Sequence, residues 1–231
     1  MDGGYAIVFQ PLVSFNSPMI RLLIATRNDH KVREIQAMLG PDFQCHTLRE
    51  FPQAPVAVED AATFAGNATK KAREIAQWLR QQPGNHPDYV LADDSGLEVD
   101  FLDGAPGVHS ARFAALDAGQ AGNATDGDNN AKLLTLLKAV PLEQRTARFR
   151  CVMALVAAHG EAADSTHLFD GTCEGRLDFA PHGAGGFGYD PLFIPNGFAV
   201  SFAELGEAVK NQISHRARAL EKLKAHFATK R

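Results

Sequence analysis

Short apolar segments alternate with segments of helical periodicity along most of this chain. Four segments are predicted to be helices, because their apolar residues recur at every third or fourth position: 30–39, 63–79, 129–140 and 214–227. The predicted strands are 20–25, 90–92, 97–101, 148–160 and 165–175, the last two as an antiparallel hairpin. Interleaved strands and helices with one antiparallel pair predict an α/β fold, with helices on both sides of a mixed sheet.

Charge and composition exclude several classes of partner. The formal net charge of −4 argues against a protein that binds nucleic acid or a membrane surface. No apolar run approaches the roughly 20 residues that a membrane span requires. The three cysteines, Cys45, Cys151 and Cys173, are far apart and lack metal-binding spacing, which favours a reducing compartment. We therefore expect a cytoplasmic protein.

The first 19 residues differ from the rest of the chain. Glycine and proline interrupt the sequence MDGGYAIVFQPLVSFNSP, and Met19 opens a more regular pattern. We expect residues 1–19 to be a disordered extension and residues 20–231 to form a single catalytic domain. A length of 231 residues gives such a domain ample core.

A glycine-rich stretch, GAGGFG at 183–188, matches the G-x-G-x-x-G string of dinucleotide-binding folds. In those folds the string follows a strand and opens a helix. Here Tyr189, Asp190 and Pro191 follow it, and then an apolar, strand-like LFI. We reject the dinucleotide interpretation, although the glycines still allow a ligand to approach the backbone closely.

The polar stretch TRNDHK, at 26–31, joins the first predicted strand to the first predicted helix. A helix N-terminus offers unpaired N–H groups, and a threonine, an asparagine and a lysine beside it suit a phosphate group. The alternative is a helix cap with a solvated lysine, because strand-to-helix turns favour such residues. This stretch alone leaves both interpretations open.

A second polar group consists of Glu59 and, after it, Thr63, Asn67 and Lys71. The last three lie four residues apart and so share one face of the predicted helix 63–79. They form either a binding surface or a stripe that faces solvent. The spacing does not decide between these alternatives.

The sequence LADDSGLEVD, at 91–100, carries four carboxylates directly after an apolar run. We expect a turn at Asp93 and Asp94, between two strands. Like charges packed this closely cost free energy unless a cation compensates them. Mg²⁺ binds through one or two carboxylates together with substrate phosphates, so the turn is a candidate metal site. The alternative is a solvated turn, which Asp-Ser-Gly also favours.

The stretch KNQISHR, at 210–216, gathers Lys210, His215 and Arg216 at the start of the last helix. Cations at a helix N-terminus oppose the helix dipole, and such a local conflict indicates function. The aromatic FGYD, at 187–190, could stack on a base. Two cationic clusters, one acidic cluster and an aromatic loop predict a Mg²⁺-dependent enzyme that acts on a nucleotide.

These stretches, in this order, resemble the inosine triphosphate pyrophosphatase family. The matching segments are ATRNDHKVREI, EDAATFAGNATKKA, ADDSGLEVD with GAPGVHSARF, GGFGYDPLF and KNQISHRARAL. They cover the chain from about residue 20 to its C-terminus. The resemblance implies an α/β fold with a long bent mixed β-sheet, two lobes with a central substrate cleft, and a homodimer.

The resemblance also implies a reaction and its residues. The family hydrolyses ITP, dITP and XTP to the monophosphate and pyrophosphate, by attack of water at the α-phosphate. Glu59 and Asp94 would bind Mg²⁺ with support from Asp93, and Asp94 would also be the catalytic base. Phe187 would stack on the base, and Arg216 or a backbone N–H near it would donate to the 6-oxo group. The residues expected to bind substrate are Thr26, Arg27, Asn28, Asp29, His30, Lys31, Lys71, Ser95, Phe187, Gly188, Tyr189, Asp190, Lys210, His215 and Arg216.

This chain departs from the family pattern near the expected metal site. The pattern often has Thr-Gly after the metal-binding glutamate, where this chain has Asp60 and Ala61, and it often has a glutamate where this chain has Gly66. Two other functions remain as alternatives. A general nucleotide or sugar-phosphate phosphatase would need no base-binding FGYD stretch, and a non-catalytic nucleotide-binding module would need no carboxylate that activates water.

Overall fold

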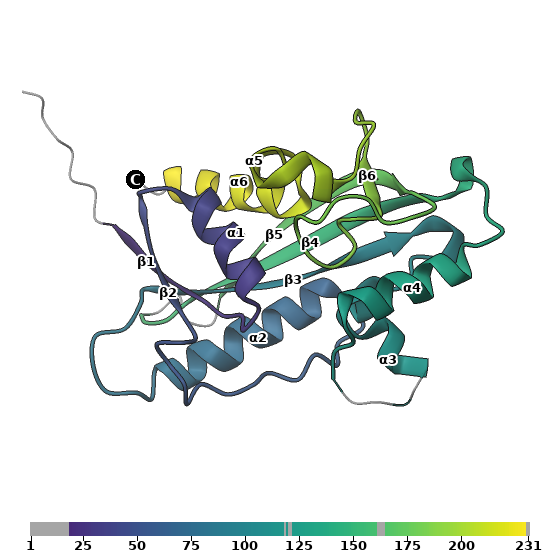
Figure 1. Ribbon diagram of the computed structural model, residues 1–231. Helices are drawn as coiled ribbons and strands as arrows, with labels where there is room; N and C mark the ends of the chain where they lie inside the picture. The colour runs from purple at the N-terminus through teal and green to yellow at the C-terminus, as the bar shows by residue number, and fades with distance from the viewer. Residues whose placement is uncertain (1–18, 118, 120–121, 161–164, 230–231) are drawn as a thin grey trace, which may run out of the picture.

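The computed structural model describes residues 19–117, 119, 122–160 and 165–229. In this part of the chain, six strands form one open sheet in the order β2-β1-β3-β4-β5-β6 (Figure 1). The strands are β1 (Ile20–Ile24), β2 (Phe43–Thr47), β3 (Tyr89–Val99), β4 (Thr146–Ala157), β5 (Thr166–Leu177) and β6 (Phe193–Pro195). β1 pairs in parallel with β2 and β3, whereas β3, β4, β5 and β6 pair antiparallel. The mixed sheet predicted from the sequence is confirmed.

Helices cover both faces of this sheet. They are α1 (Asp29–Leu39), α2 (Phe64–Leu79), α3 (Phe113–Asp117), α4 (Asp126–Leu136), α5 (Phe202–Ile213) and α6 (His215–Ala228). In Figure 1, α1, α5 and α6 lie above the sheet, and α2, α3 and α4 lie below it. The helix predicted at 129–140 begins earlier, because the side chain of Thr125 caps it by accepting from the N–H of Asp128, and it ends earlier, at Leu136.

Alternate side chains along a strand point to opposite faces of the sheet, so each layer of helices packs on a separate hydrophobic core. Leu22 and Ile24 of β1 pack in the core that includes α1 and α6, whereas Leu23 packs against α2. A third core, built around Phe149 and Phe193, lies at the other end of the sheet. These cores hold α1, α2 and α6 on opposite faces of the centre of β3, so that their polar ends meet there.

The acidic part of β3 differs from the prediction. The sequence predicts a turn between strands at 90–92 and 97–101, and this prediction is wrong: β3 is continuous. Asp93 and Asp94 lie inside it, 1% and 5% exposed, and both keep their backbone pairing with β4. The strand does not turn toward water, because cations from α1, α2 and α6 contact the two aspartates.

The aspartates lie where the sheet narrows. The pairing of β3 with β1 ends at Leu91, just before Asp93, and α1 begins shortly after β1 ends. The carboxyl end of β1, the N-terminus of α1 and the two aspartates are therefore neighbours. Ligands of α/β proteins usually bind at this edge of a sheet.

Three elements, β2, α3 and α5, were not predicted. β2 is an edge strand of mixed polarity, FQCHT, and it is only partly buried. The helical pattern of α5 is interrupted at Gly206, whose φ of 77° is not helical. The predicted disordered extension, 1–19, falls outside the described residues apart from Met19. Among the described residues, no helix has both the length and the apolar character that a membrane crossing requires.

Candidate active site

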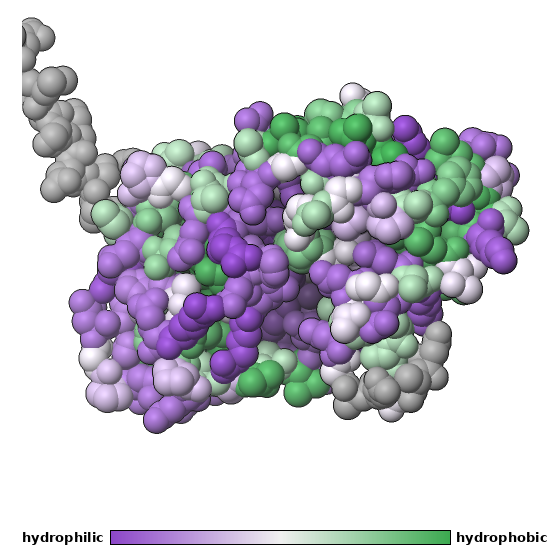
Figure 2. All heavy atoms as spheres, viewed as in Figure 1, coloured by the Kyte–Doolittle hydropathy of each residue, from purple (hydrophilic) through white to green (hydrophobic). Residues whose placement is uncertain are grey.

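A cleft of about 490 Å³ opens beside the centre of β3. Figure 2 shows it as a deep hollow in the middle of the molecule, bordered mostly by hydrophilic residues. Of the residues predicted to bind substrate or metal, all line this cleft except Asp29 and His30. The fold therefore brings together stretches that are far apart in the sequence, and the individual roles of their residues stay predictions.

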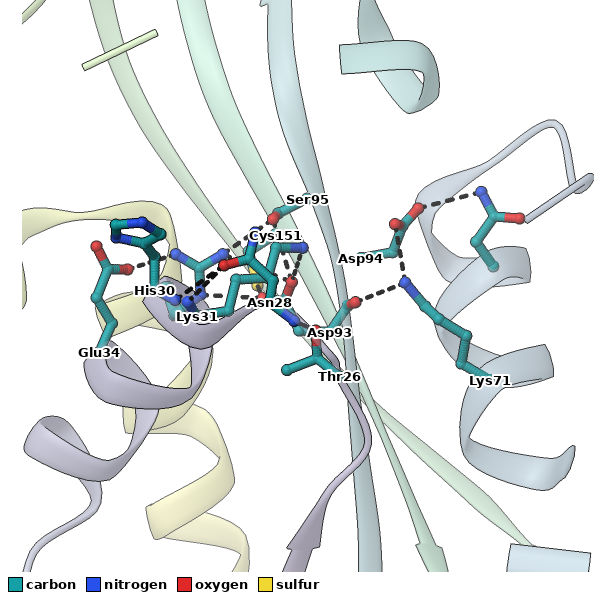
Figure 3. Close-up of polar contacts among 12 residues, drawn as sticks. Thr26, Asn28, His30, Lys31, Glu34, Lys71, Asp93, Asp94, Ser95 and Cys151 are labelled. Atoms are coloured by element: carbon teal, nitrogen blue, oxygen red, sulfur yellow. Dashed lines mark hydrogen bonds and ion pairs between the residues drawn. The ribbon is translucent and has the colours of Figure 1, made fainter. Parts of the chain in front are cut away.

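The two adjacent aspartates point to opposite sides of β3 (Figure 3), as neighbouring residues of a strand must. Asp93 faces α1 and α6, and it forms ion pairs with Lys31 and with Arg216, whose Nε lies 3.1 Å from Oδ2. Burial alone would raise the pKa of Asp93, but the charges of Arg216 and Lys31 outweigh it and hold the pKa well below its usual range. Asp93 is therefore a charged structural centre beneath the cleft.

Asp94 faces α2, where it shares a lysine with Glu59. The Nζ of Lys71 lies 3.1 Å from Oδ1 of Asp94 and 2.8 Å from Oε1 of Glu59, and it also donates to the backbone carbonyl of Asp93. Burial raises the pKa of Asp94, and the charge of Glu59 reinforces this against the opposing effect of Lys71. Asp94 thus has less compensating positive charge than Asp93, and it lines the cleft.

Several polar side chains at the N-terminus of α1 form hydrogen bonds or ion pairs with other groups of the protein. Asn28 caps the helix by accepting from the N–H groups of His30 and Lys31, and Arg27 donates to a backbone carbonyl at 2.8 Å. Asp29 is half exposed and forms an ion pair with Arg49 outside the cleft. Thr26 and Lys31 line the cleft, so this end of α1 retains groups suited to phosphate.

The glycine loop before β6 supplies the aromatic part of the cleft. Phe187 lies under the ammonium of Lys210, which is 4.6 Å from the ring centroid, and it stacks on His30 at a centroid distance of 5.2 Å. Asp190 fixes the loop by accepting from the N–H of Phe187 at 2.8 Å and from Lys210 at 2.5 Å. Gly186 has a φ of 73°, and a Cβ there would lie 2.1 Å from the Asp190 carboxylate, so glycine is required.

The start of α6 brings His215 and Arg216 to the same cleft. His215 is buried against Phe149, with ring centroids 4.9 Å apart, and its Nδ1 has no hydrogen-bond partner within the described part of the chain. Burial and the nearby Arg216 and Lys210 keep the pKa of His215 well below its usual range, so the imidazole is neutral. A neutral ring with an unpaired nitrogen in a cleft is suited to a hydrogen bond with a ligand.

Three residues that the sequence analysis did not assign complete the polar framework. Glu34 joins Arg216 and Lys210, at 2.5 and 2.8 Å. Asn67 donates to the Asp94 carboxylate, and Arg112 donates to the backbone carbonyl of the segment that carries Glu59. Asn67 lay in the stripe whose exposure the spacing left open, and it proves fully buried. Glu34 is the last position of the family pattern T/S-x-N-x-x-K-x-x-E in its segment, but that pattern assigned it no role.

Two carboxylates in this cleft can supply oxygen ligands to a cation. The described residues contain no group of three or more histidine, cysteine, aspartate or glutamate side chains placed to hold a metal. Glu59 and Asp94 both line the cleft and lie on either side of the Lys71 ammonium. Mg²⁺ commonly binds one or two carboxylates plus the phosphates of its substrate, so this pair fits that ion.

The fold and the cleft define an α/β protein with a charged ligand site at the edge of a mixed sheet. The chain belongs to the Ham1 family, whose model matches residues 22–226. A Geobacter sulfurreducens protein named dITP/XTP pyrophosphatase is 47% identical over 90% of this chain and 97% of its own. A Geobacillus kaustophilus protein of the same name is 46% identical over 89% of this chain and 93% of its own.

Solved structures agree with this family. The Staphylococcus aureus Ham1 protein superposes with a TM-score of 0.76, at 32% identity, over 91% of this chain and all of its own. A HAM1 protein from Coxiella burnetii gives a TM-score of 0.75 at 36% identity, with the same coverage. The family resemblance drawn from the sequence is confirmed.

Proposed function

We propose that the protein hydrolyses deaminated purine nucleoside triphosphates, ITP, dITP and XTP, to the monophosphate and pyrophosphate. One observation carries this function: a single cleft joins the Glu59–Asp94 pair and its lysines to the aromatic loop at Phe187. The first group suits a triphosphate with a cation, and the second suits a base. The names of the relatives from Geobacter sulfurreducens and Geobacillus kaustophilus support dITP and XTP as substrates.

Glu59 and Asp94 would hold Mg²⁺, which when bound neutralises negative charge on the phosphates and on the leaving pyrophosphate. Lys31 and Lys71 would add positive charge at the same phosphates. The raised pKa of Asp94 makes it the better proton acceptor of the two cleft carboxylates, since the charge of Lys71 helps to lower the pKa of Glu59. Asp94 would take the proton from the water that attacks the α-phosphorus.

The protein would distinguish ITP and XTP from ATP by the 6-oxo group of their bases, and this would require a hydrogen-bond donor at the start of α6. All three nitrogens of the Arg216 guanidinium donate to oxygens of Glu34, Asp93 or Ser95. The first N–H groups of a helix, in contrast, have no acceptor within the helix. Of the two donors expected from the sequence, the backbone N–H near Arg216 is therefore the better one. It would pair with a 6-oxo group and would be left unpaired by adenine.

We also propose a cytoplasmic homodimer. The three cysteines are free thiols, which supports a reducing compartment. The dimer is supported by the family resemblance, and sedimentation of the purified protein tests it.

The proposed reaction is tested by incubating the protein and Mg²⁺ with ITP, dITP, XTP, GTP or ATP and identifying the phosphate product. We expect pyrophosphate from ITP, dITP and XTP and little product from ATP or GTP. Asp94→Asn should lose this activity, whereas Asp170→Asn, an exposed aspartate paired with Lys222, should keep it. Orthophosphate as the product would contradict the proposal and favour a general phosphatase. Binding of ITP without any product would favour a non-catalytic module.

A further inference from the structure

We propose that Asn67 is a positioning residue for the divalent cation: it fixes which oxygen of Asp94 faces Glu59, and it ties the segment that carries Glu59 to α2. The inference rests on the proposed function, in which Glu59 and Asp94 hold Mg²⁺. Asn67 itself would touch neither the cation nor the substrate.

The side chain of Asn67 is fully buried, with 0% exposure, in the first turn of α2. Its Nδ2 donates to Oδ2 of Asp94 at 3.2 Å, and its Oδ1 accepts from the backbone N–H of Ala61 at 2.9 Å. Both ends of the amide therefore have partners, as a buried polar group requires. One partner is a proposed ligand, and the other lies two residues beyond Glu59, the second proposed ligand.

The contact with Asp94 distinguishes its two carboxylate oxygens. Asn67 holds Oδ2, whereas Oδ1 faces the Lys71 ammonium, which also contacts Glu59. Asn67 and Lys71 are separated by one helical turn, so they approach Asp94 from the same face of α2. If Lys71 moved toward a phosphate, Asn67 would still keep Oδ1 turned toward Glu59.

The contact with Ala61 secures the Glu59 segment, which we define as residues 59–61. The Arg112 guanidinium donates to the carbonyl of Glu59 at 3.0 Å, so the segment is held at both ends. Gly66 lets the segment approach α2 closely, because a Cβ at that position would lie 2.7 Å from the Cβ of Ala61. Asn67 thus links one carboxylate directly to the backbone that carries the other.

Residues of this kind, which orient a metal ligand without touching the metal, commonly change metal affinity by about 10- to 100-fold when they are replaced. Asn67→Ala should therefore weaken the effect of Mg²⁺ on nucleotide binding. It should leave the binding that needs no Mg²⁺ close to that of the parent protein, because Phe187, Lys31 and the start of α6 are unchanged.

The probe is α,β-methylene ITP, which cannot release pyrophosphate, titrated calorimetrically in EDTA and in Mg²⁺. In the parent protein, Mg²⁺ should tighten binding; in Asn67→Ala this gain should fall about 10- to 100-fold while binding in EDTA persists. The matched control is Leu79→Ala, which truncates a fully buried side chain at the other end of α2. It should lower the melting temperature and keep the Mg²⁺-dependent gain.

Three results would overturn the inference: an unchanged gain in Asn67→Ala, an equal loss of binding in EDTA and in Mg²⁺, or the same loss of gain in Leu79→Ala. If Asn67→Ala does not fold, Asn67→Leu, which keeps more of the side-chain volume, carries the same expectation. Absence of any Mg²⁺ effect in the parent protein is a distinct result, because it contradicts the proposed function itself and the inference with it.

Discussion

At the scale of single residues, Asp93 and Asp94 are neighbours in β3 that have opposite electrostatic surroundings. Asp93 is compensated by Arg216 and Lys31, and its pKa lies well below its usual range. The pKa of Asp94 is raised by burial and by Glu59. The alternation of side chains along the strand separates a compensated anion on one face from the carboxylate on the other face that lines the cleft.

Glu34 is a buried carboxylate beside the cleft whose charge is balanced by buried cations. It contacts Arg216 and Lys210, and their charges hold its pKa below its usual range against the effect of burial. A carboxylate with a lowered pKa stabilises the fold above its ordinary pKa of about 4.3, and this contribution is lost as pH falls through the lower folded value.

We therefore predict that Glu34→Gln loses about 3 kcal/mol of unfolding free energy near neutral pH, because Arg216 and Lys210 lose a buried anion. The difference from the parent protein should shrink as pH falls below about 4.3, the ordinary pKa of a glutamate, and through the lower pKa that Glu34 has in the folded parent. Urea unfolding at several pH values measures both effects. Glu221→Gln, at an exposed position of α6, is the control. A difference that stays constant down to the acid-unfolded range would contradict the prediction.

The motifs predicted which residues line the cleft better than they predicted how those residues are used. Lys31, Lys71, Asp94 and Phe187 were assigned because their residue types suit phosphate, metal and base. Glu34 was missed because its partner Arg216 lies 182 positions away in the sequence, and only the packing of α1 against α6 brings them together. Burial of this kind is a property of the fold and not of a local pattern.

At the scale of elements, the helices α1, α2 and α6 were predicted to within a residue or two, and the centre of β3 was not. A helix can be recognised from the sequence because its apolar face makes apolar residues recur at every third or fourth position. Two adjacent aspartates, in contrast, predict an exposed turn, because an isolated strand would not bury them. Their cations come from α1, α2 and α6, so the sequence around 93–94 cannot reveal that β3 continues.

The contact between the Glu59 segment and α2 explains two departures from the family pattern together. Where the pattern often has glycine this chain has Ala61, and where the pattern often has glutamate this chain has Gly66. A Cβ at position 66 would lie 2.7 Å from the Cβ of Ala61 and 3.1 Å from Oγ1 of Thr63, so side chains at both 61 and 66 would collide. An alanine at 61 therefore fits only with a small residue at 66, which glycine provides.

We predict that Gly66→Ala destabilises the protein by about 1 kcal/mol: overpacking costs about 1–3 kcal/mol, and better helix propensity returns about 1 kcal/mol. Adding Ala61→Gly removes the nearest clash, so the double variant should be more stable than Gly66→Ala alone. Urea unfolding of the two variants and the parent measures this coupling. A single variant at least as stable as the parent would show that the segment does not pack as described.

At the scale of the whole molecule, the mixed sheet explains why distant stretches form one site. β1 ends beside the middle of the longer β3, and α1, α2 and α6 each present a polar end at that point. The cleft therefore has a charged region at Glu59 and Asp94 and an aromatic region at Phe187. This arrangement fits a nucleotide whose triphosphate and base are recognised separately.

In the proposed reaction, water attacks the α-phosphorus of a triphosphate held at Asp94. The most direct test is to hydrolyse ITP with the protein and Mg²⁺ in water enriched in oxygen-18, and to locate the label by mass spectrometry. Attack at the α-phosphorus breaks its bond to the bridging oxygen, so the label should appear in the monophosphate and not in pyrophosphate. Label in pyrophosphate, or labelled orthophosphate as the first product, would contradict attack at the α-phosphorus.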